Sequence, residues 1–198
     1  MGARPFIIGL TGAMGMGKSA TAGLFAERGI PVFDADRAAH DIYANPVSVQ
    51  RDLEALFPGC VIEGSISRTR VAAQMTPEKL ARLEALIHPV VLQMREQFVG
   101  HHAAAPILLF DTPLLLETGA KVDAVVVASA PEQVQRQRVL ARPGMTEAKF
   151  AALSARQLSD AQKRAQADYV VMTDKGLDDA HEQVKMILAD IRQKISHA

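Results

Sequence analysis

Short apolar runs alternate along this chain with longer segments in which apolar positions recur at helical spacing. The apolar runs predict five strands, at residues 6–10, 31–34, 106–111, 122–128 and 169–172. The helical spacing predicts helices at 18–28, 132–141, 146–166 and 178–194, and a mostly helical stretch from 36 to about 97 with breaks at 45–46, 58–59 and 64. Strands that alternate with helices form βαβ units, so the pattern predicts an α/β fold around a parallel sheet.

Most of the predicted strands are continuous apolar runs, which is typical of a parallel sheet covered by helices on both faces. The helical stretch between the second and third strands is longer than a simple crossover needs, so we expect an inserted substrate-binding lobe there. The segment between the last two strands is a second candidate for a mobile element. We expect one unit with a core at about 5–35, 104–135 and 167–198, a helical substrate domain at about 36–103 and a lid at about 136–166.

Composition narrows the class of protein. The 198 residues are 48% apolar and 22% charged, which is ordinary for a globular chain with a full core. The 22 basic and 22 acidic side chains leave no net charge, which argues against nucleic acid or a membrane surface as a partner. Cys60 is the only cysteine, and no apolar run approaches the about 20 residues of a membrane span. We therefore expect a cytoplasmic protein that is a monomer or a weak homo-oligomer.

The segment from Gly12 to Ser19 fits the pattern G-x-x-x-x-G-K-[ST] of a P-loop, between a predicted strand and a predicted helix. Its glycines let successive backbone N–H groups point at one anion, and the following helix adds the positive end of its dipole. Lys18 is expected to reach the β- and γ-phosphates of ATP, and the Ser19 hydroxyl is expected to ligate Mg²⁺. We assign nucleotide binding to Gly12, Ala13, Met14, Gly15, Met16, Gly17, Lys18, Ser19 and Ala20.

Two aspartates, Asp34 and Asp36, follow the second predicted strand, at the strand end where open α/β sheets bind ligands. On an extended segment both carboxylates could face one side, where a kinase needs a base beside the acceptor hydroxyl. The alternative is a helix N-cap followed by a solvated acid. Position alone does not separate these interpretations.

Asp111 ends the third predicted strand and has the Walker B placement, so it is expected to act on Mg²⁺. The alternative is a strand-ending cap. Between residues 129 and 167, basic side chains outnumber acidic ones by seven to three. Within that stretch Arg138 and Arg142 lie four residues apart, on one helix face, and are expected to stabilise the transferring phosphoryl group. The alternative there is a solvated charged face.

Other nucleotide-binding classes fit the motifs less well. A GTPase needs D-x-x-G after the third strand, but Asp111 is followed by Thr-Pro-Leu. Near the last strand, 173–176 reads Thr-Asp-Lys-Gly rather than N-K-x-D. The histidines lack the spacing of a zinc site, and His88, before Pro89 at an expected helix start, is either structural or near the substrate. A small-molecule kinase remains, with an ATP-dependent switch module as the non-enzyme alternative.

Taken in order, these motifs resemble those of the dephospho-CoA kinase family along almost the whole chain. The resemblance rests on residues 8–19, 29–36, 63–68, 87–90, 111–117 and 135–142, and on Gln157, Lys163, Ala167–Asp168 and Val170–Val171. It implies a P-loop NTPase, nucleotide-kinase-like three-layer fold with a central five-stranded parallel sheet, a helical substrate insertion and a lid. The implied reaction is phosphorylation of the ribose 3′-hydroxyl of dephospho-CoA by ATP, the last step of coenzyme A synthesis.

The resemblance also implies roles for particular residues. Asp36 would be the base that activates the hydroxyl, and Asp34 would support it or the metal shell. Lys18, Arg138 and Arg142 would stabilise the phosphoryl group. Substrate binding would involve Asp36, His88, Leu114, Leu115, Glu117, Arg156 and Gln157. The chain departs from the family pattern at Ala20, at Ser67 and at Thr173–Asp174, the last of which concerns an adenine contact.

Overall fold

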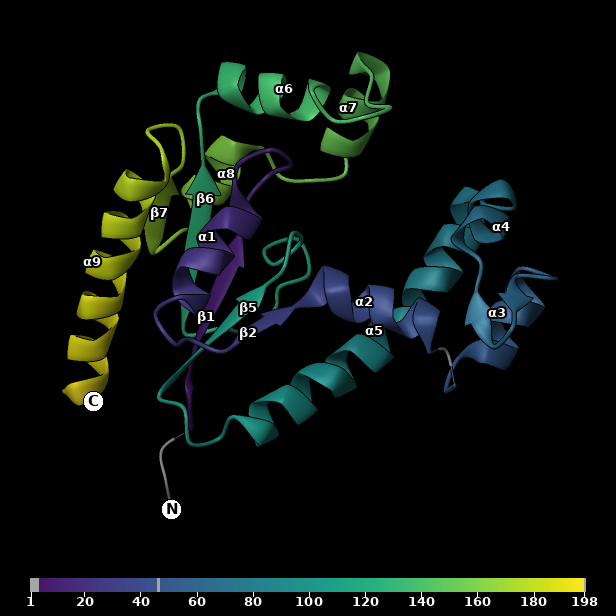
Figure 1. Cartoon of the computed structure of the whole chain (residues 1–198), viewed down its shortest axis with the longest axis horizontal. Coiled ribbons are helices and arrows are strands. Elements are labelled where there is room, and N and C mark those ends of the chain that lie inside the picture. Colours follow the sequence, from purple (N-terminus) through teal and green to yellow (C-terminus); the bar gives the residue numbers. More distant parts are fainter. Residues whose placement is uncertain (1–3, 46, 198) are drawn as a thin grey trace. The chain divides into compact units, whose positions relative to one another are not determined.

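The computed structural model describes residues 4–45 and 47–197, and its elements alternate as the sequence predicts (Figure 1). The principal strands are β1 (Phe6–Thr11), β2 (Val32–Asp34), β5 (Ile107–Asp111), β6 (Ala124–Ser129) and β7 (Tyr169–Met172). The helices are α1 (Lys18–Ala26), α2 (Ala35–Ala44), α3 (Gln50–Leu56), α4 (Arg68–Ala73), α5 (Pro77–His101), α6 (Glu132–Leu140), α7 (Glu147–Ser154), α8 (Asp160–Arg164) and α9 (Leu177–Ser196). A short hairpin joins β3 (Val61–Ile62) to β4 (Ser65–Ile66).

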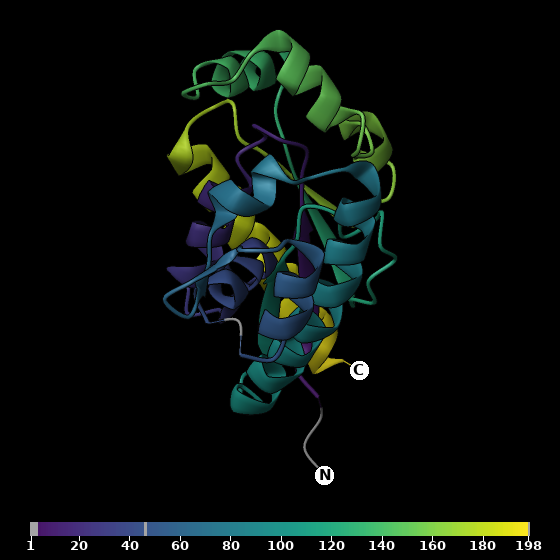
Figure 2. The ribbon, with the colours of Figure 1, turned by 90° about the vertical axis from the view of Figure 1, so that its right-hand side faces the viewer.

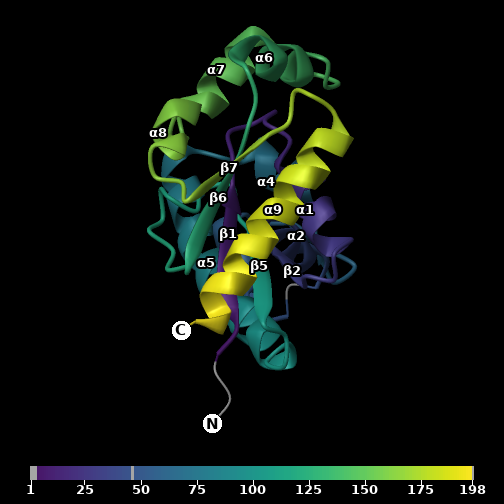
Figure 3. The same cartoon turned by 90° about the vertical axis from the view of Figure 1, so that its left-hand side faces the viewer.

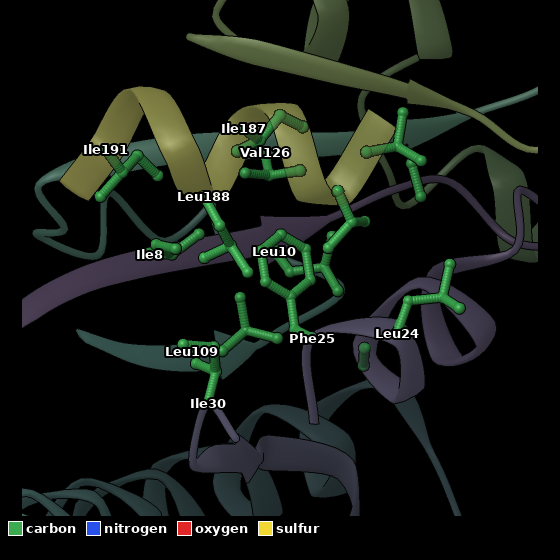
Figure 4. Close-up of a cluster of buried hydrophobic side chains, with 14 of the residues drawn as sticks. Ile8, Leu10, Leu24, Phe25, Ile30, Leu109, Val126, Ile187, Leu188 and Ile191 are labelled. Atoms are coloured by element: carbon green, nitrogen blue, oxygen red, sulfur yellow. The ribbon is translucent and has the colours of Figure 1, made fainter. Parts of the chain in front are cut away.

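The central sheet has five strands in the order β2-β5-β1-β6-β7. β5 and β6 run parallel to β1 on either side of it, and β7 runs parallel to β6. Apolar side chains of α1 and α9 pack on one face of these strands; Figure 4 shows Phe25 and Leu188 meeting Leu10 and Leu109. All four are at most 1% exposed. This core fixes the carboxyl ends of the strands, where the predicted site residues follow.

The chain divides into two compact units. The sheet unit comprises the residues up to Phe33 and from His102 onward, and the helical unit runs from Asp34 to His101. The helical unit, blue to teal in Figure 2, has its own core. This core is built from residues such as Leu53, Phe57 and Ile87. The roles of substrate domain and lid, predicted for residues 36–103 and 136–166, stay predictions.

The single helix predicted over 146–166 is wrong, because the structure divides it into α7 and α8. Thr146 caps α7 as its sequence suggests. Ser159 then starts α8 with a capping box in which Gln162 takes part. The break frees the backbone N–H of Leu158, which donates to the carboxylate of Glu117 at 2.8 Å. Contacts with distant segments therefore end the first helix.

The mostly helical stretch predicted from 36 to 97 also needs two corrections. β3 and β4 form a hairpin whose two-residue turn, Glu63-Gly64, has positive φ at both positions, as a type I′ turn requires. Pro89 lies inside α5 rather than at a helix start. A proline costs a helix interior about 3 kcal/mol, and apolar packing of Leu83 and Ile87 before it, with Val91 after it, favours the continuous helix. One of the predicted breaks falls at residues 45–46, and residue 46 lies outside the described residues.

Glu63→Asn is expected to stabilise the helical unit by about 1 kcal/mol, because Glu63 has a φ of 48° and asparagine tolerates this left-handed conformation better. Denaturant-induced unfolding measures the gain. Glu63→Ala is the matched control and is expected to give no gain, since alanine has the same steric conflict. Equal stability of the wild type and Glu63→Asn would contradict a strained turn.

Candidate active site

The P-loop, residues 12–19, connects β1 to α1, and its backbone is held in a conformation that only glycine fits at two motif positions. Gly17 has a φ of 86° and precedes the first residue of α1. A Cβ on Gly17 would lie 2.8 Å from Thr173 Oγ1, and one on Gly12 would lie 2.7 Å from the backbone oxygen of Ala128. The glycines therefore let β6 and the segment after β7 approach the loop closely, which fixes the shape of the anion cradle.

Two glutamines hold the peptide groups of Met14, at the tip of the P-loop. Gln135 of α6 donates from Nε2 to the Met14 carbonyl at 2.8 Å. The Met14 N–H donates to Oε1 of Gln157, in the break between α7 and α8, at 3.2 Å. In Figure 3, α6 and α7 lie beyond the carboxyl ends of the strands, next to this loop. Gln157 of the predicted lid, and Gln135 directly before it, thus contact the loop through side-chain hydrogen bonds.

Arg138 fastens the other side of the P-loop to the segment after β7. Its guanidinium donates to Thr173 Oγ1 at 2.8 Å and to the Thr173 carbonyl at 2.6 Å. Thr173 Oγ1 in turn donates to the Met16 carbonyl at 2.9 Å. Arg142 differs, because its side chain is exposed and forms no hydrogen bond or ion pair with residues 4–45 or 47–197. Of the two predicted arginines, Arg138 shapes the loop and Arg142 is the one with an unengaged guanidinium.

Lys18 and Asp111 form an ion pair between the start of α1 and the end of β5. The side chains are 13% and 4% exposed. The sequence predicted a phosphate ligand and a metal-associated acid at these positions, and the structure brings the two together. Ser19, in the first turn of α1, is exposed. A cation, a carboxylate and a hydroxyl therefore gather at the carboxyl ends of β1 and β5.

The post-β5 loop, residues 112–119, carries three predicted substrate contacts. Leu115 is only 1% exposed, and a Cβ on Gly9 would meet it at 2.5 Å, so it packs against β1 while Leu114 is half-buried. Glu117 has an exposed main chain, but its side chain is 18% exposed and turns inward to the fully buried Lys163. Burial by itself raises the pKa of Glu117, but hydrogen bonds from Lys163 and the Leu158 N–H outweigh it, and the pKa is lowered.

Glu117→Gln is expected to lower the free energy of unfolding at neutral pH by about 3 kcal/mol, because it leaves the Lys163 ammonium buried without its counter-ion. The pKa of Glu117 is lower in the folded chain than its ordinary 4.5, so its stabilisation is complete above that value and is lost as the pH falls through the folded pKa. The difference between wild type and variant should therefore shrink in acid. Unfolding curves at about pH 7 and about pH 3 measure it.

The control for that measurement is Glu147→Gln, which removes an exposed partner of Arg136. Exposed ion pairs contribute at most about 1 kcal/mol, so this variant should unfold almost as the wild type does. A loss as small for Glu117→Gln would show that Lys163 does not depend on this carboxylate.

The remaining predicted residues lie in or near α2 and α5 of the helical unit, or before α8. Asp34 is the N-cap of α2, with its carboxylate accepting from the Arg37 N–H at 2.9 Å, so the capping alternative holds for it. Asp36 lies in the first turn of α2 and is exposed. We expected both aspartates on one extended segment, but the helix starts between them because Asp34 is its N-cap. His88 is exposed on α5, and Arg156 is exposed before α8.

A protein-family model described as dephospho-CoA kinase matches residues 6–179. The chain belongs to the dephospho-CoA kinase family. The dephospho-CoA kinase of Novosphingobium aromaticivorans is 47% identical over 195 residues, covering 96% of this chain and 97% of that protein. The dephospho-CoA kinase of Mesorhizobium japonicum is 46% identical over 192 residues, covering 94% and 96%. The family predicted from the motifs, and with it an enzyme, is therefore confirmed.

Solved structures agree with the fold class. The crystal structure of TT1252 from Thermus thermophilus is 32% identical to this dephospho-CoA kinase family member, with a TM-score of 0.81 and coverage of 95% of this chain and 98% of that one. A shikimate kinase from Bacteroides thetaiotaomicron shares the fold at 15% identity, with a TM-score of 0.54 and coverage of 93% and 98%. The nucleotide-kinase-like fold with its five-stranded parallel sheet is confirmed.

Several residues of this dephospho-CoA kinase family site were not among the predicted ones. Gln135 and Thr173 hold the P-loop, and Lys163 holds the post-β5 loop. The resemblance included 135 and 163 as matching positions, but gave them no role. In the sequence Lys163 stands beside Arg164 in a polar helix, so nothing in its pattern indicates burial. Only the packing of α8 against β6 reveals it.

Proposed function

We propose that the chain transfers the γ-phosphoryl group of ATP to the ribose 3′-hydroxyl of dephospho-CoA, giving coenzyme A and ADP. The observation that carries the proposal is the family match over residues 6–179, which includes the P-loop described above. In this step the acceptor oxygen forms a bond to Pγ, the bond from Pγ to the β,γ-bridging oxygen breaks, and ADP leaves. The hydroxyl proton needs a base.

The P-loop supplies the phosphate site. Its backbone N–H groups and the N-terminus of α1 favour an anion at the carboxyl end of β1. Lys18, now paired with Asp111, carries the charge that would bind the β- and γ-phosphates. Arg142 would add its unengaged guanidinium as charge develops on the phosphoryl group, while Arg138 keeps the loop in shape. A closing movement within residues 136–166, in the segment after α6 that carries Arg142, would bring this guanidinium to the phosphates while Arg138 and Lys163 keep their contacts.

The residues present fit a magnesium ion bound mainly by phosphate and water. Ser19 offers an exposed hydroxyl, and Asp111 offers a carboxylate at the strand end. Residues 4–45 and 47–197 contain no group of three or more His, Cys, Asp or Glu side chains placed to hold a metal. Mg²⁺ keeps several waters and takes one or two protein ligands beside substrate phosphates, so this sparse donor set suits it. The ion would neutralise charge on the β- and γ-phosphates.

On the acceptor side, Asp36 is the proposed base, as the resemblance to the family implies: it is exposed in the first turn of α2, directly after the strand end, while Asp34 caps the helix. Asp34 would support it through this cap. His88, Leu114 and Arg156 would contact the acceptor directly, with Leu115 beneath Leu114. Glu117 and Gln157 would also take part in substrate binding; Glu117 is paired with Lys163, and Gln157 accepts a hydrogen bond from the Met14 N–H.

A coupled ADP-release assay with ATP and Mg²⁺ tests the proposal, with dephospho-CoA compared with shikimate, gluconate and AMP. Turnover with dephospho-CoA alone is expected. ADP release with a different acceptor would keep the kinase and discard the substrate. ATP binding without turnover of any acceptor would favour the switch-module alternative.

We also propose a cytoplasmic location and a monomer or weak homo-oligomer. The single cysteine fits a reducing compartment. Within the described residues, no helix is long and apolar enough to cross a membrane. Size-exclusion chromatography with light scattering tests the oligomeric state.

A further inference from the structure

Lys163 is fully buried, and no step of the proposed reaction uses it. Its ammonium lies 2.8 Å and 3.0 Å from the two carboxylate oxygens of Glu117. It also donates to the Pro113 carbonyl at 3.0 Å and to Thr11 Oγ1 at 3.3 Å. The Thr11 hydroxyl donates its own proton to the same Pro113 carbonyl at 2.9 Å, which leaves its lone pairs for the lysine. The ammonium has three N–H donors for these four acceptors, so the two oxygens of Glu117 share one of them.

These contacts join three segments of the sheet unit that are distant in sequence. Thr11 ends β1 and immediately precedes the P-loop. Pro113 and Glu117 lie at the two ends of the part of the post-β5 loop that contains Leu114 and Leu115. Lys163 itself belongs to α8, at the end of the predicted lid. One side chain thus connects the root of the phosphate site to the loop proposed to contact the acceptor.

The post-β5 loop depends on this connection more than the P-loop root does. β1 is hydrogen-bonded to β5 on one side and to β6 on the other, so Thr11 stays in place without Lys163. At the start of the loop, the Thr112 N–H donates to the Leu10 carbonyl of β1. The backbone N–H groups of residues 118–120 donate to carbonyls of residues 114–116, so they do not attach the loop to another segment. Among the residues that the structure describes, its polar anchors outside the loop, beyond residue 112, are the Thr11 hydroxyl, the Leu158 N–H and Lys163.

A buried ion pair is a poor way to gain stability alone, since well-packed apolar side chains often do as well or better. Hydrogen bonds from the ammonium are directional: they hold the Pro113 carbonyl and the Glu117 carboxylate at defined distances, which apolar packing does not do. A function that depends on the exact course of the loop explains the arrangement better than stability does.

We propose that Lys163 is a positioning residue for the acceptor: through Pro113 and Glu117 it holds the post-β5 loop in the course that binds dephospho-CoA. The inference rests on the proposed function. Loss of Lys163 should therefore weaken acceptor use and leave nucleotide binding nearly unchanged.

The test compares Lys163→Met with Arg164→Met. Arg164 is the next residue of α8, 52% exposed, and its carboxylate contact, to Asp160, is 4.0 Å long. We measure KM for dephospho-CoA, KM for ATP, kcat, and the Kd of a fluorescent ATP analogue, with thermal unfolding to confirm that each variant is folded. Lys163→Met should raise KM for dephospho-CoA about 10-fold or more, because small misplacements of binding groups carry large kinetic costs. KM and Kd for the nucleotide should change less than about two-fold, and Arg164→Met should match the wild type.

Lys163→Met leaves Glu117 without its cation and could prevent folding, so Thr11→Val is the second variant. It keeps the ion pair and nearly the same volume, but removes the hydroxyl from Pro113 and Lys163. A several-fold rise in KM for dephospho-CoA alone is expected. Unchanged acceptor KM in whichever variants fold, or an equal loss of nucleotide affinity, would overturn the positioning role. Failure of the wild type to use dephospho-CoA would instead refute the proposed function.

Discussion

Replacing Lys18 by alanine is expected to lower kcat with dephospho-CoA by about 10³-fold or more, since it removes a cation from the developing phosphoryl charge in a site with few others. Arg138 does not compensate, because its guanidinium is bound to Thr173. The measurement is steady-state ADP release at saturating ATP and acceptor. A fully active, folded Lys18→Ala protein would remove the P-loop from the mechanism.

Stability complicates this experiment, because Lys18 is also the partner of Asp111, whose side chain is 4% exposed. Lys18→Ala takes the cation from a buried carboxylate and should lower the unfolding temperature as well. Lys18→Arg separates the two effects: it keeps a positive charge for Asp111, but its longer planar fork displaces the phosphate contact. We expect Lys18→Arg to be more stable than Lys18→Ala and still strongly impaired. Lys185→Ala, which alters an exposed lysine of α9, is the control.

Asp36→Asn is expected to lower kcat by about 10²-fold or more, the usual scale for losing a general base. Asparagine has nearly the same size and leaves the first turn of α2 intact, so the loss should appear without a change in stability. The matched control is Asp41→Asn, which removes an exposed carboxylate from the same helix. Nearly wild-type kcat for Asp36→Asn would exclude Asp36 as the base.

Asp34→Asn is a third variant to compare with Asp36→Asn and Asp41→Asn, at the N-cap of the same helix. Asparagine caps helices as well as aspartate does, so the variant removes the charge of Asp34 but keeps the hydrogen bond to the Arg37 N–H. If Asp34 acts only by capping α2, Asp34→Asn should lower kcat much less than Asp36→Asn does. An equal loss would give the charge of Asp34 a direct part in the reaction.

The sequence predicted the sheet well because its signals are local. The run Tyr169–Met172 is a strand with the predicted bounds, and Gly12–Ser19 is a loop and helix start between the predicted neighbours. The Glu63-Gly64 hairpin could also have been predicted, since a glycine-containing pair between short apolar segments is a turn signal.

Other features depend on contacts that no local pattern encodes. Residues 146–166 have helical composition throughout, and the helix breaks because Gln157 and Leu158 bond to Met14 and Glu117, far away in the sequence. The burial of Lys163 has the same origin. Asp34 and Asp36 were ambiguous because capping and catalysis favour the same residue type at a strand end; the backbone of α2 assigns the cap to Asp34.

Cys60 lies in the core of the helical unit with no exposed surface, and burial, followed by the negative charge of Glu54, raises the pKa of its thiol. A buried, protonated thiol is inert toward alkylating reagents. New cysteines placed on α7 or on the post-β5 loop could therefore carry fluorophores without removal of the native one. In the unaltered chain, the rate at which Cys60 reacts would report how often the helical unit opens by itself.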